Sequence, residues 1–334
     1  MIKSQNISWP IIGHDKVISL LERSFHADQL SHAYLFSGPS SVGKWTTAEY
    51  LARLLTCTEK VGLIPCEKCD SCRQSIKGSH SDIIKVSREE EQKISIEKIR
   101  NLRSRLSFRP FISKKKIAII KDVEHLTAAA SNALLKTLEE PTSDTIIILT
   151  CNDVDRVLLT IRSRCTTLLF YQVPSSIIAE GLMKEGADKK IANSISLISQ
   201  GRPGQAINYF KEQSTIDEYY EQLHLFLELK RGSIVDRYTR INELLPKGGQ
   251  NHSARTTLEA LFLQWQQLLR KTLLQSYKVD NDRSGREKQF VDQLKIAYSP
   301  YELIALIKKL STMISMLRNN VQPYILAESV ILHI

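Results

Sequence analysis

The sequence predicts an α/β protein whose parallel sheet carries helices on both faces and is followed by an all-helical part. Five short β-branched or apolar runs alternate with helical patterns, at Ala33–Phe36, Asp82–Val86, Ile117–Ile120, Thr145–Thr150 and Thr166–Phe170. Runs of this length separated by helices are typical of parallel strands buried on both faces. After Val173–Pro174 the strand pattern stops and only helical patterns remain.

The length of 334 residues predicts more than one domain. We expect an α/β domain at 1–172 with a small module inserted at 57–72, a small helical domain at 173–210 and a longer helical domain at 211–334. The apolar content of 42% and charged content of 25% are those of a soluble globular protein. The N-terminus has no apolar signal region, and no apolar run is long enough to span a bilayer, so we expect a cytoplasmic protein without membrane contact.

Two helices stand out by their apolar spacing. Ser95–Leu106 begins on a capping serine and repeats apolar residues every three or four positions. Ser253–Ser276 does the same over a longer span, which predicts one buried face used for an ordinary core or a subunit interface. The segment Pro246–His252 is expected to be a loop that separates two helices.

A basic stretch, Lys98 to Lys116, contains eight Lys or Arg residues and no acid, around Phe108 and Phe111. The net charge of the chain is +10. These features permit contact with DNA phosphates. A solvated helix face followed by a basic loop explains them equally well, so both interpretations stay open.

A second pattern, Gly38-x₄-Gly43-Lys44, follows the predicted strand at Ala33–Phe36 and precedes a helical run. This is the setting of a phosphate-binding loop. In such a loop main-chain N–H groups, the positive end of the helix and the lysine face phosphate oxygens. Gly38, Gly43, Lys44 and Thr46 are therefore candidate nucleotide-binding residues of a degenerate loop.

The loop lacks the residues that hold magnesium. Trp45 stands where a Ser or Thr hydroxyl should be, and Thr46 is rotated by roughly 100° from that position. The strand Ile117–Ile120 runs into Lys121-Asp122, so that a lysine replaces a carboxylate. A lysine about 4 Å from Mg²⁺ costs on the order of 8 kcal/mol at an effective dielectric of about 20. Binding of ATP or ADP without magnesium remains open, and hydrolysis is not expected.

Four cysteines form a third pattern, Cys57-x₈-Cys66-x₂-Cys69-x₂-Cys72. Four thiolates with two tight C-x₂-C steps suit a structural, tetrahedral zinc ion with no open ligand position. Iron–sulfur binding and metal-free cysteines are the alternatives. Cys151 and Cys165 lie at predicted strand ends and are expected to be small buried residues.

Four blocks in order, "WPIIGHDKVISLL", "SHAYLFSGP", "SNALLKTLEEP" and "TIRSRC", together with these motifs, resemble clamp-loader subunits of the AAA+ class over about residues 8–210. The resemblance implies a RecA-like AAA+ domain with an inserted zinc module, a helical lid domain and a helical collar that oligomerises. It implies gamma/tau and delta subunits as partners, primer–template DNA within the assembled complex, and indirect contact with the sliding clamp.

Within that family the chain is most similar to the non-hydrolysing delta-prime type of the bacterial DNA polymerase III clamp loader. The motor subunits carry Asp-Glu after the strand, where this chain has Lys121 and Asp122. They also carry an arginine at the position of Gly204. The resemblance assigns Arg164, in Ser163-Arg164-Cys165, as an arginine finger that reaches a neighbouring subunit's ATP site.

Two other functions are carried as alternatives. The first is an active gamma/tau-like motor ATPase that uses Thr46 and Asp122 in displaced roles. The second is a nucleic-acid-binding module that grips DNA without partners through its cysteine cluster and basic stretch.

Overall fold

The protein is described from a computed structural model, whose described residues are 9–89, 93–141, 144–245, 251–279, 287–319 and 321–332. The chain forms two compact units, Met1–Phe210 and Lys211–Ile334, each considered by itself below. No helix within the described ranges is long and apolar enough to cross a membrane. The three domain boundaries expected from the sequence stay predictions.

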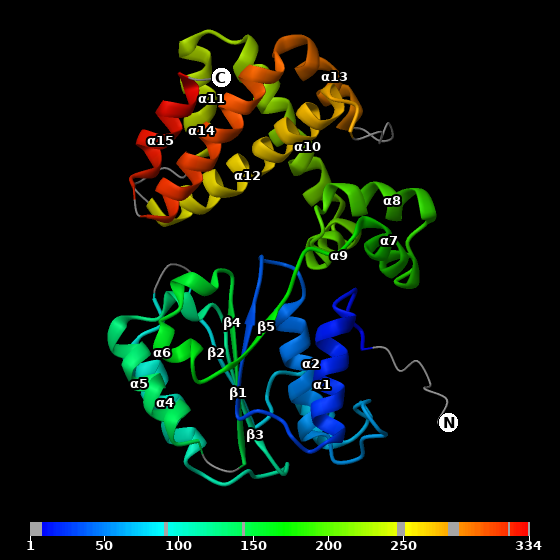
Figure 1. Ribbon diagram of the computed structural model, residues 1–334, viewed down its shortest axis with the longest axis vertical. Helices are drawn as coiled ribbons and strands as arrows, with labels where there is room; N and C mark the ends of the chain where they lie inside the picture. Colours follow the sequence, from blue (N-terminus) through cyan, green and yellow to red (C-terminus); the bar gives the residue numbers. More distant parts are fainter. Residues whose placement is uncertain are drawn as a thin grey trace. The chain divides into compact units, whose positions relative to one another are not determined.

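A five-stranded parallel sheet forms the centre of the first unit, with strand order β2-β3-β4-β1-β5 (Figure 1). The strands are β1 Ala33–Ser37, β2 Ile83–Val86, β3 Lys116–Ile120, β4 Thr145–Cys151 and β5 Thr166–Leu169. Every strand end lies within one residue of its predicted position. The prediction of an α/β fold with a parallel sheet is therefore confirmed.

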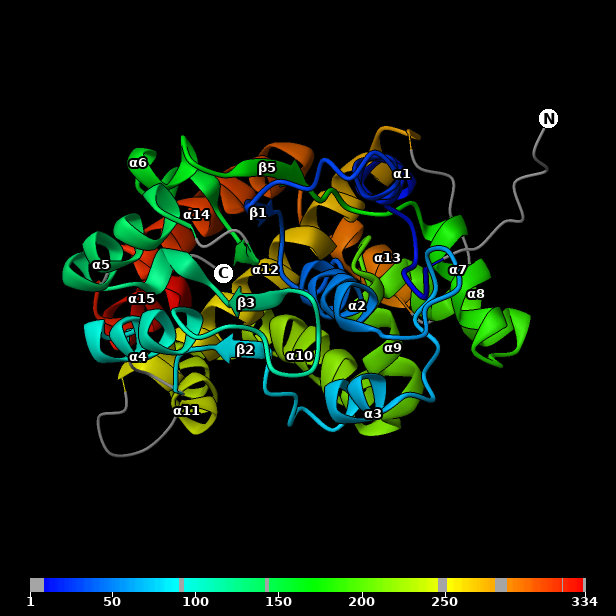
Figure 2. The same cartoon turned by 90° about the horizontal axis from the view of Figure 1, so that it is seen from below.

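Helices cover both faces of the sheet (Figure 1 and Figure 2). Along β1, Tyr34 and Phe36 pack toward α1 Asp15–His26 and α2 Lys44–Thr56. Leu35 points to the opposite face, in the core shared with α4 Ile96–Leu106, α5 Ala128–Glu139 and α6 Leu159–Arg162. Successive strand residues alternate between faces, so each strand contributes to both cores.

The remaining elements of the first unit lie at the edges of the sheet and after it. They are α3 Asp70–Ile76, the 3₁₀ turns η1 Val123–His125 and η2 Val154–Arg156, α7 Ser175–Lys184, α8 Lys189–Ile198 and α9 Pro203–Lys211. The predicted helix Ser95–Leu106 is α4, with Ser95 as its N-cap residue. Its buried face is formed by Ile99, Leu102 and Leu106.

The second unit is all helical. Its helices are α10 Gln213–Arg231, α11 Ile234–Leu244, α12 Asn251–Ser276, α13 Glu287–Ala297, α14 Pro300–Arg318 and α15 Pro323–Ile331. The long helix α12 contacts α10, α13, α14 and α15. Its Trp265 is fully buried and donates a hydrogen bond to the Gln222 carbonyl oxygen at 2.8 Å. The apolar face predicted for Ser253–Ser276 is thus the core of this unit.

One expectation in this unit was wrong in extent. The loop predicted at Pro246–His252 reaches too far, because α12 already begins at Asn251. Helix formation by Asn251 and His252 adds main-chain hydrogen bonds at the start of a long helix that is anchored by a buried face. Residues 246–250 of that predicted loop lie outside the described residues.

Candidate functional site

A glycine-rich loop, residues 38–43, connects β1 to the N-terminus of α2. Gly38 and Gly43 have φ values of 154° and 109°. A Cβ on Gly38 would lie 2.0 Å from the carbonyl oxygen of Phe170, so only glycine lets the loop pass this close to the chain after β5. The loop therefore has the strand–loop–helix setting expected of a phosphate loop. Its role in nucleotide binding stays a prediction.

Lys44, the lysine of this loop, is bonded within the loop itself. Its ammonium group donates to the carbonyl oxygens of Gly38 and of Pro39, the latter at 2.6 Å, and to Asn152 Oδ1 at 3.1 Å. Burial lowers the pKa of Lys44 to about 8, although the nearby Asp122 carboxylate acts to raise it. The charge that would meet a phosphate is thus already satisfied by protein oxygens.

The Trp45 ring, which follows Lys44 in the chain, lies near two lysine ammonium groups. The ammonium groups of Lys121 and Lys85 lie 5.7 and 5.9 Å from the centre of the Trp45 ring. Lys85 is also paired with Glu49 at 2.5 Å. Two cations around an indole form a cation–π cluster, which is an unfavourable setting for Mg²⁺. Thr46, by contrast, lines a cleft together with Val42 and Gly43 of the loop.

Two carboxylates after β3 are held by one asparagine. Asn152 donates from its side-chain amide to Asp122 Oδ1 at 3.3 Å and from its main-chain N–H to Glu124 Oε1 at 2.8 Å. Its Oδ1 accepts from Lys44. Burial raises the pKa of Glu124. Lysine, asparagine and both acids therefore form one closed network.

A cleft of about 720 Å³ lies beside the loop, between the N-terminal segment 9–13, α1, the start of α2, α7 and α9. Among its described lining residues, four are acidic and one is basic: Asp15, Glu22, Glu180, Glu185 and Lys184. The rest of the lining is largely apolar. Its lining therefore carries more negative than positive charge, which disfavours the phosphates of a nucleotide.

Helix α9 closes directly onto the loop at Gly204. The Gly204 N–H donates to the Ser41 carbonyl oxygen at 2.8 Å. A Cβ at Gly204 would lie 2.9 Å from the same oxygen. The position at which motor subunits carry an arginine is here a main-chain contact between α9 and the loop. The lack of a side chain is what permits this approach.

The four predicted metal ligands are brought together at the C-terminal end of α2. The sulfur atoms of Cys57, Cys66, Cys69 and Cys72 all lie within 4.8 Å of one another. Two of these separations are 3.9 Å, from Cys57 to Cys69, and 4.0 Å, from Cys66 to Cys72. A tetrahedral zinc ion with bonds of ~2.3 Å would require about 3.8 Å, so the sulfur geometry fits.

Main-chain groups also support the cysteines as ligands. The N–H of Cys66 points to Cys57 Sγ at 3.3 Å, and the N–H of Cys69 to Cys66 Sγ at 3.2 Å. Such donors stabilise thiolates. Burial acts to raise the pKa of Cys69, but hydrogen bonds, first that of Thr58, lower it to about 6. Burial raises the pKa of Cys57 and of Cys72, so metal binding there would release protons.

Arg164 lies at the surface, just after α6. Its guanidinium group is paired with Glu139 at 2.7 Å and donates to the Thr160 carbonyl oxygen at 2.9 Å. Of the two other cysteines, Cys151 is fully buried, as predicted, whereas Cys165 is only partly buried.

Within the basic stretch from Lys98 to Lys116, the two end residues are bonded to the protein itself. Lys116 is 7% exposed and donates to the Arg105 carbonyl oxygen at 2.6 Å. Lys98 is paired with Glu89 at 2.9 Å. The aromatic residues Phe108 and Phe111, however, are 68% and 85% exposed.

A buried carboxylate that sequence reasoning missed holds the end of this stretch in place. Asp82 is fully buried, and its side chain accepts from the N–H groups of Phe111, Ile112 and Ser113 at 2.8 to 2.9 Å. The Ser113 hydroxyl donates to it as well. The Asp82 N–H in turn donates to His80 Nδ1 at 3.0 Å. The partners are about thirty residues away along the chain, so no local pattern could reveal them.

Comparison with known proteins places the chain in a family. The profile of a family described as DNA polymerase III, delta subunit, matches residues 13–174. The delta' subunit of DNA polymerase III from Bacillus subtilis is 34% identical over 227 residues, which are 65% of this chain and 68% of that protein. The chain belongs to the family of DNA polymerase III clamp-loader subunits.

Within this family the comparisons do not separate types. The tau subunit of Bacillus subtilis is 29% identical over 327 residues, or 90% of this chain. The chain spans only 56% of the length of that tau subunit. A solved gamma subunit-related protein from Thermotoga maritima covers 94% of the chain with 18% identity and a TM-score of 0.38, from which nothing further is drawn.

Proposed function

We propose that the chain is a stator, a subunit of the clamp loader that helps to load the sliding clamp onto primed DNA without hydrolysing ATP itself. The observation that carries the proposal is that Trp45 replaces the hydroxyl residue of the motif and that the ammonium groups of Lys121 and Lys85 lie 5.7 and 5.9 Å from its ring centre. The loop-bonded Lys44 and the acidic lining of the cleft support it independently. Nucleotide binding in this cleft is not part of the proposal.

The proposed partners are gamma/tau and delta subunits in a cytoplasmic, heteromeric ring of AAA+ type, with primer–template DNA in the assembled complex. The helical unit 211–334 is the proposed collar, and 173–210 the proposed lid. Arg164 is the proposed finger for a neighbour's ATP site. Its position at the surface supports this role, because an exposed guanidinium group can reach another subunit. In other proteins an arginine near a γ-phosphate increases the rate of hydrolysis by about 10³- to 10⁵-fold.

Zinc is the proposed metal of the four cysteines. Bound there, it would cross-link segment 57–72 and stabilise its fold, with no ligand position left for catalysis. The sulfur separations near 4 Å and the N–H donors to Cys57 and Cys66 support this choice.

The deciding experiment measures magnesium-dependent ATP hydrolysis by the purified chain alone and then mixed with its motor subunits. We expect no turnover alone and an increased turnover in the mixture. Turnover by the chain alone that disappears in Lys44→Ala would contradict the stator function.

The second candidate function is an active gamma/tau-like motor. The match to a tau subunit over 90% of this chain favours it, as does the location of Thr46 on the cleft. It predicts turnover by the isolated chain, which the stator function does not.

A further inference from the structure

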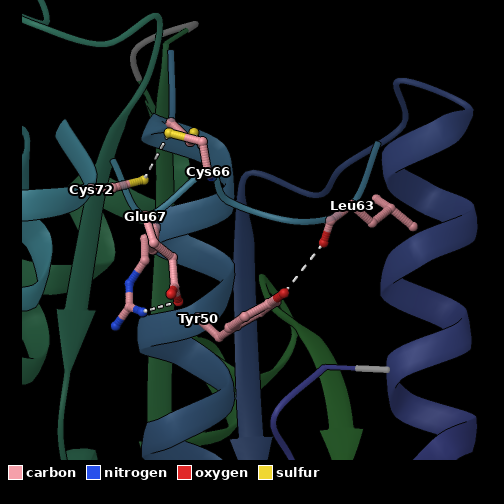
Figure 3. A network of polar contacts seen from close by, with 7 residues as sticks. Tyr50, Leu63, Cys66, Glu67 and Cys72 are labelled. Carbon is pink, nitrogen blue, oxygen red and sulfur yellow. Dashed lines mark hydrogen bonds and ion pairs between the residues drawn. The ribbon is translucent and has the colours of Figure 1, made fainter. Parts of the chain in front are cut away.

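The cysteine segment 57–72 is attached to helix α2 by two side chains (Figure 3). The Tyr50 hydroxyl donates to the Leu63 carbonyl oxygen at 3.4 Å. One helical turn later, Arg53 is paired with Glu67 at 3.4 Å. Tyr50 and Leu63 are 6% and 7% exposed, so this attachment is part of the core.

The same tyrosine supports the wall of the cleft. The rings of Tyr50 and Trp9 lie 4.8 Å apart, and Trp9 lines the cleft. Trp9, Tyr50 and Leu63 belong to one buried cluster. A second contact joins the segment to helix α1, because the Lys60 ammonium lies 4.8 Å from the ring of Phe25 on that helix.

From Trp9 the contact continues to α7. Ile12, three residues further along the cleft wall, packs against Gly181 so closely that a Cβ there would lie 2.6 Å from Ile12 Cδ1. Both residues line the cleft. Contacts therefore join Leu63 to Trp9 through Tyr50, and the chain that follows Trp9 leads within three residues to Ile12, which packs against α7.

Segment 57–72 has little of its own structure to hold Leu63 in place. Among the described residues between Cys57 and α3, the regular main-chain pairing is a single β-bridge from Val61 to Ile64, around Gly62 at φ 60°. The position of Leu63 thus depends on the cysteines that flank it. A metal ion that joins all four cysteines would fix it.

We propose that metal bound by the four cysteines controls the shape of the cleft, with Tyr50 as the residue that transmits the effect to Trp9 and α7. The inference rests on the proposed metal site but not on the stator function. With metal bound, the segment supports Tyr50 and Trp9. Without it, Leu63 is released and the cleft wall loses order.

Hydrogen exchange of the full-length chain tests this coupling, with Zn²⁺ bound and after removal by a chelator. We expect exchange in residues 9–20 and 175–184 to accelerate by about tenfold on removal, near the upper end of what one aromatic pair contributes. Residues 128–138 of α5, on the other face of the sheet, and 258–270 in the second unit should not change.

Two tyrosine variants locate the path. Tyr50→Leu should bind metal as the wild type does, show rapid exchange at 9–20 already with metal, and change little on removal. Tyr34→Phe, which alters another buried tyrosine whose hydroxyl accepts from the Ser31 N–H, should behave like the wild type.

Metal binding is followed separately by the thiolate absorption of bound Co²⁺. If Co²⁺ gives that absorption but exchange at 9–20 is the same with and without metal, the coupling is wrong and the metal site stands. An equal response in Tyr50→Leu and wild type would also overturn it. Absence of thiolate absorption would overturn metal site and coupling together.

Discussion

Arg164 Nη2 lies 2.7 Å from Glu139 Oε1, so the proposed finger is held by the last residue of α5. The side chains are 35% and 48% exposed. An exposed pair of this kind contributes about 0 to 1 kcal/mol to stability. The guanidinium group is thus oriented at the surface and can leave Glu139 for a phosphate at little cost.

Replacing Arg164 should affect a partner and not the chain itself. We expect Arg164→Ala to change the free energy of unfolding by less than about 1 kcal/mol. In a mixture with motor subunits it should lower the stimulated ATP turnover by about 10³-fold or more. Arg162→Ala is the control, because Arg162 is paired with Asp155 at 3.2 Å nearby. Equal stimulation by Arg164→Ala and wild type would contradict the finger assignment.

Gly204→Ala should weaken the contact between α9 and the glycine-rich loop. The new Cβ would meet the Ser41 carbonyl oxygen at 2.9 Å. Although alanine normally stabilises a helix, we expect a loss of about 1 to 3 kcal/mol from this overpacking. Thermal unfolding and hydrogen exchange at 38–43 measure it. Asn208→Ala, at an exposed position on the same helix, should have no comparable effect.

Loss of one cysteine should remove the metal and unfold its segment locally. We expect Cys72→Ser to bind no zinc and to lose up to about 10 kcal/mol of local folding free energy, while the sheet stays folded. Zinc content and exchange at 57–72 report the two effects. Cys165→Ser, outside the cluster, should retain one zinc ion per chain; if Cys72→Ser also retains it, the ligand set is wrong.

Asp82→Asn should destabilise the loop before β3 in a pH-dependent manner. Burial acts to raise the pKa of Asp82, but the donors from Phe111, Ser113 and Ile112 outweigh it and lower the pKa. The unfolded chain then binds the proton first, so the stabilisation is present above about pH 4 and disappears as pH falls through the folded-state pKa. Denaturant unfolding of both chains should converge at low pH. A constant difference would mean that Asp82 is not charged in the fold.

Lys44 should make the stability of the chain depend on pH in the alkaline range, whereas Asp82 does so in the acidic range. Its pKa of about 8 lies below the ordinary value near 10.4 because burial penalises the charged form. Between these values the unfolded chain binds more protons, so the stability of the wild type relative to Lys44→Met should rise with pH from about 8 to 10.4. Unfolding curves of both chains at several pH values measure this. If the stability difference between the two chains did not change with pH, Lys44 would be solvated and its pKa would not be lowered.

Local patterns predicted most of the fold and part of the site. The strands were predicted because β-branched runs such as Thr145–Thr150 pack well on the pleated surface of a buried sheet. The cysteine cluster was predicted because ligand spacing in the sequence limits geometry in space. The end of the loop at Pro246–His252 was placed too late, since helix α12 begins at Asn251, before its apolar face does.

The remaining features depend on contacts between distant residues. The bonding of Lys44 to Asn152 spans 108 positions, and the contact of Gly204 with Ser41 depends on how α9 packs. The acidic lining of the cleft combines residues of two separate helices, α1 and α7, with Glu185 just after α7. None of these follows from the spacing of residues in the sequence.

The buried Asp82 carboxylate holds the loop that follows α4 chiefly by main-chain groups. The path of this loop therefore depends little on which side chains it carries. Residues such as Phe111 can be exchanged, for a cross-linker or a fluorescent label, without displacing the backbone.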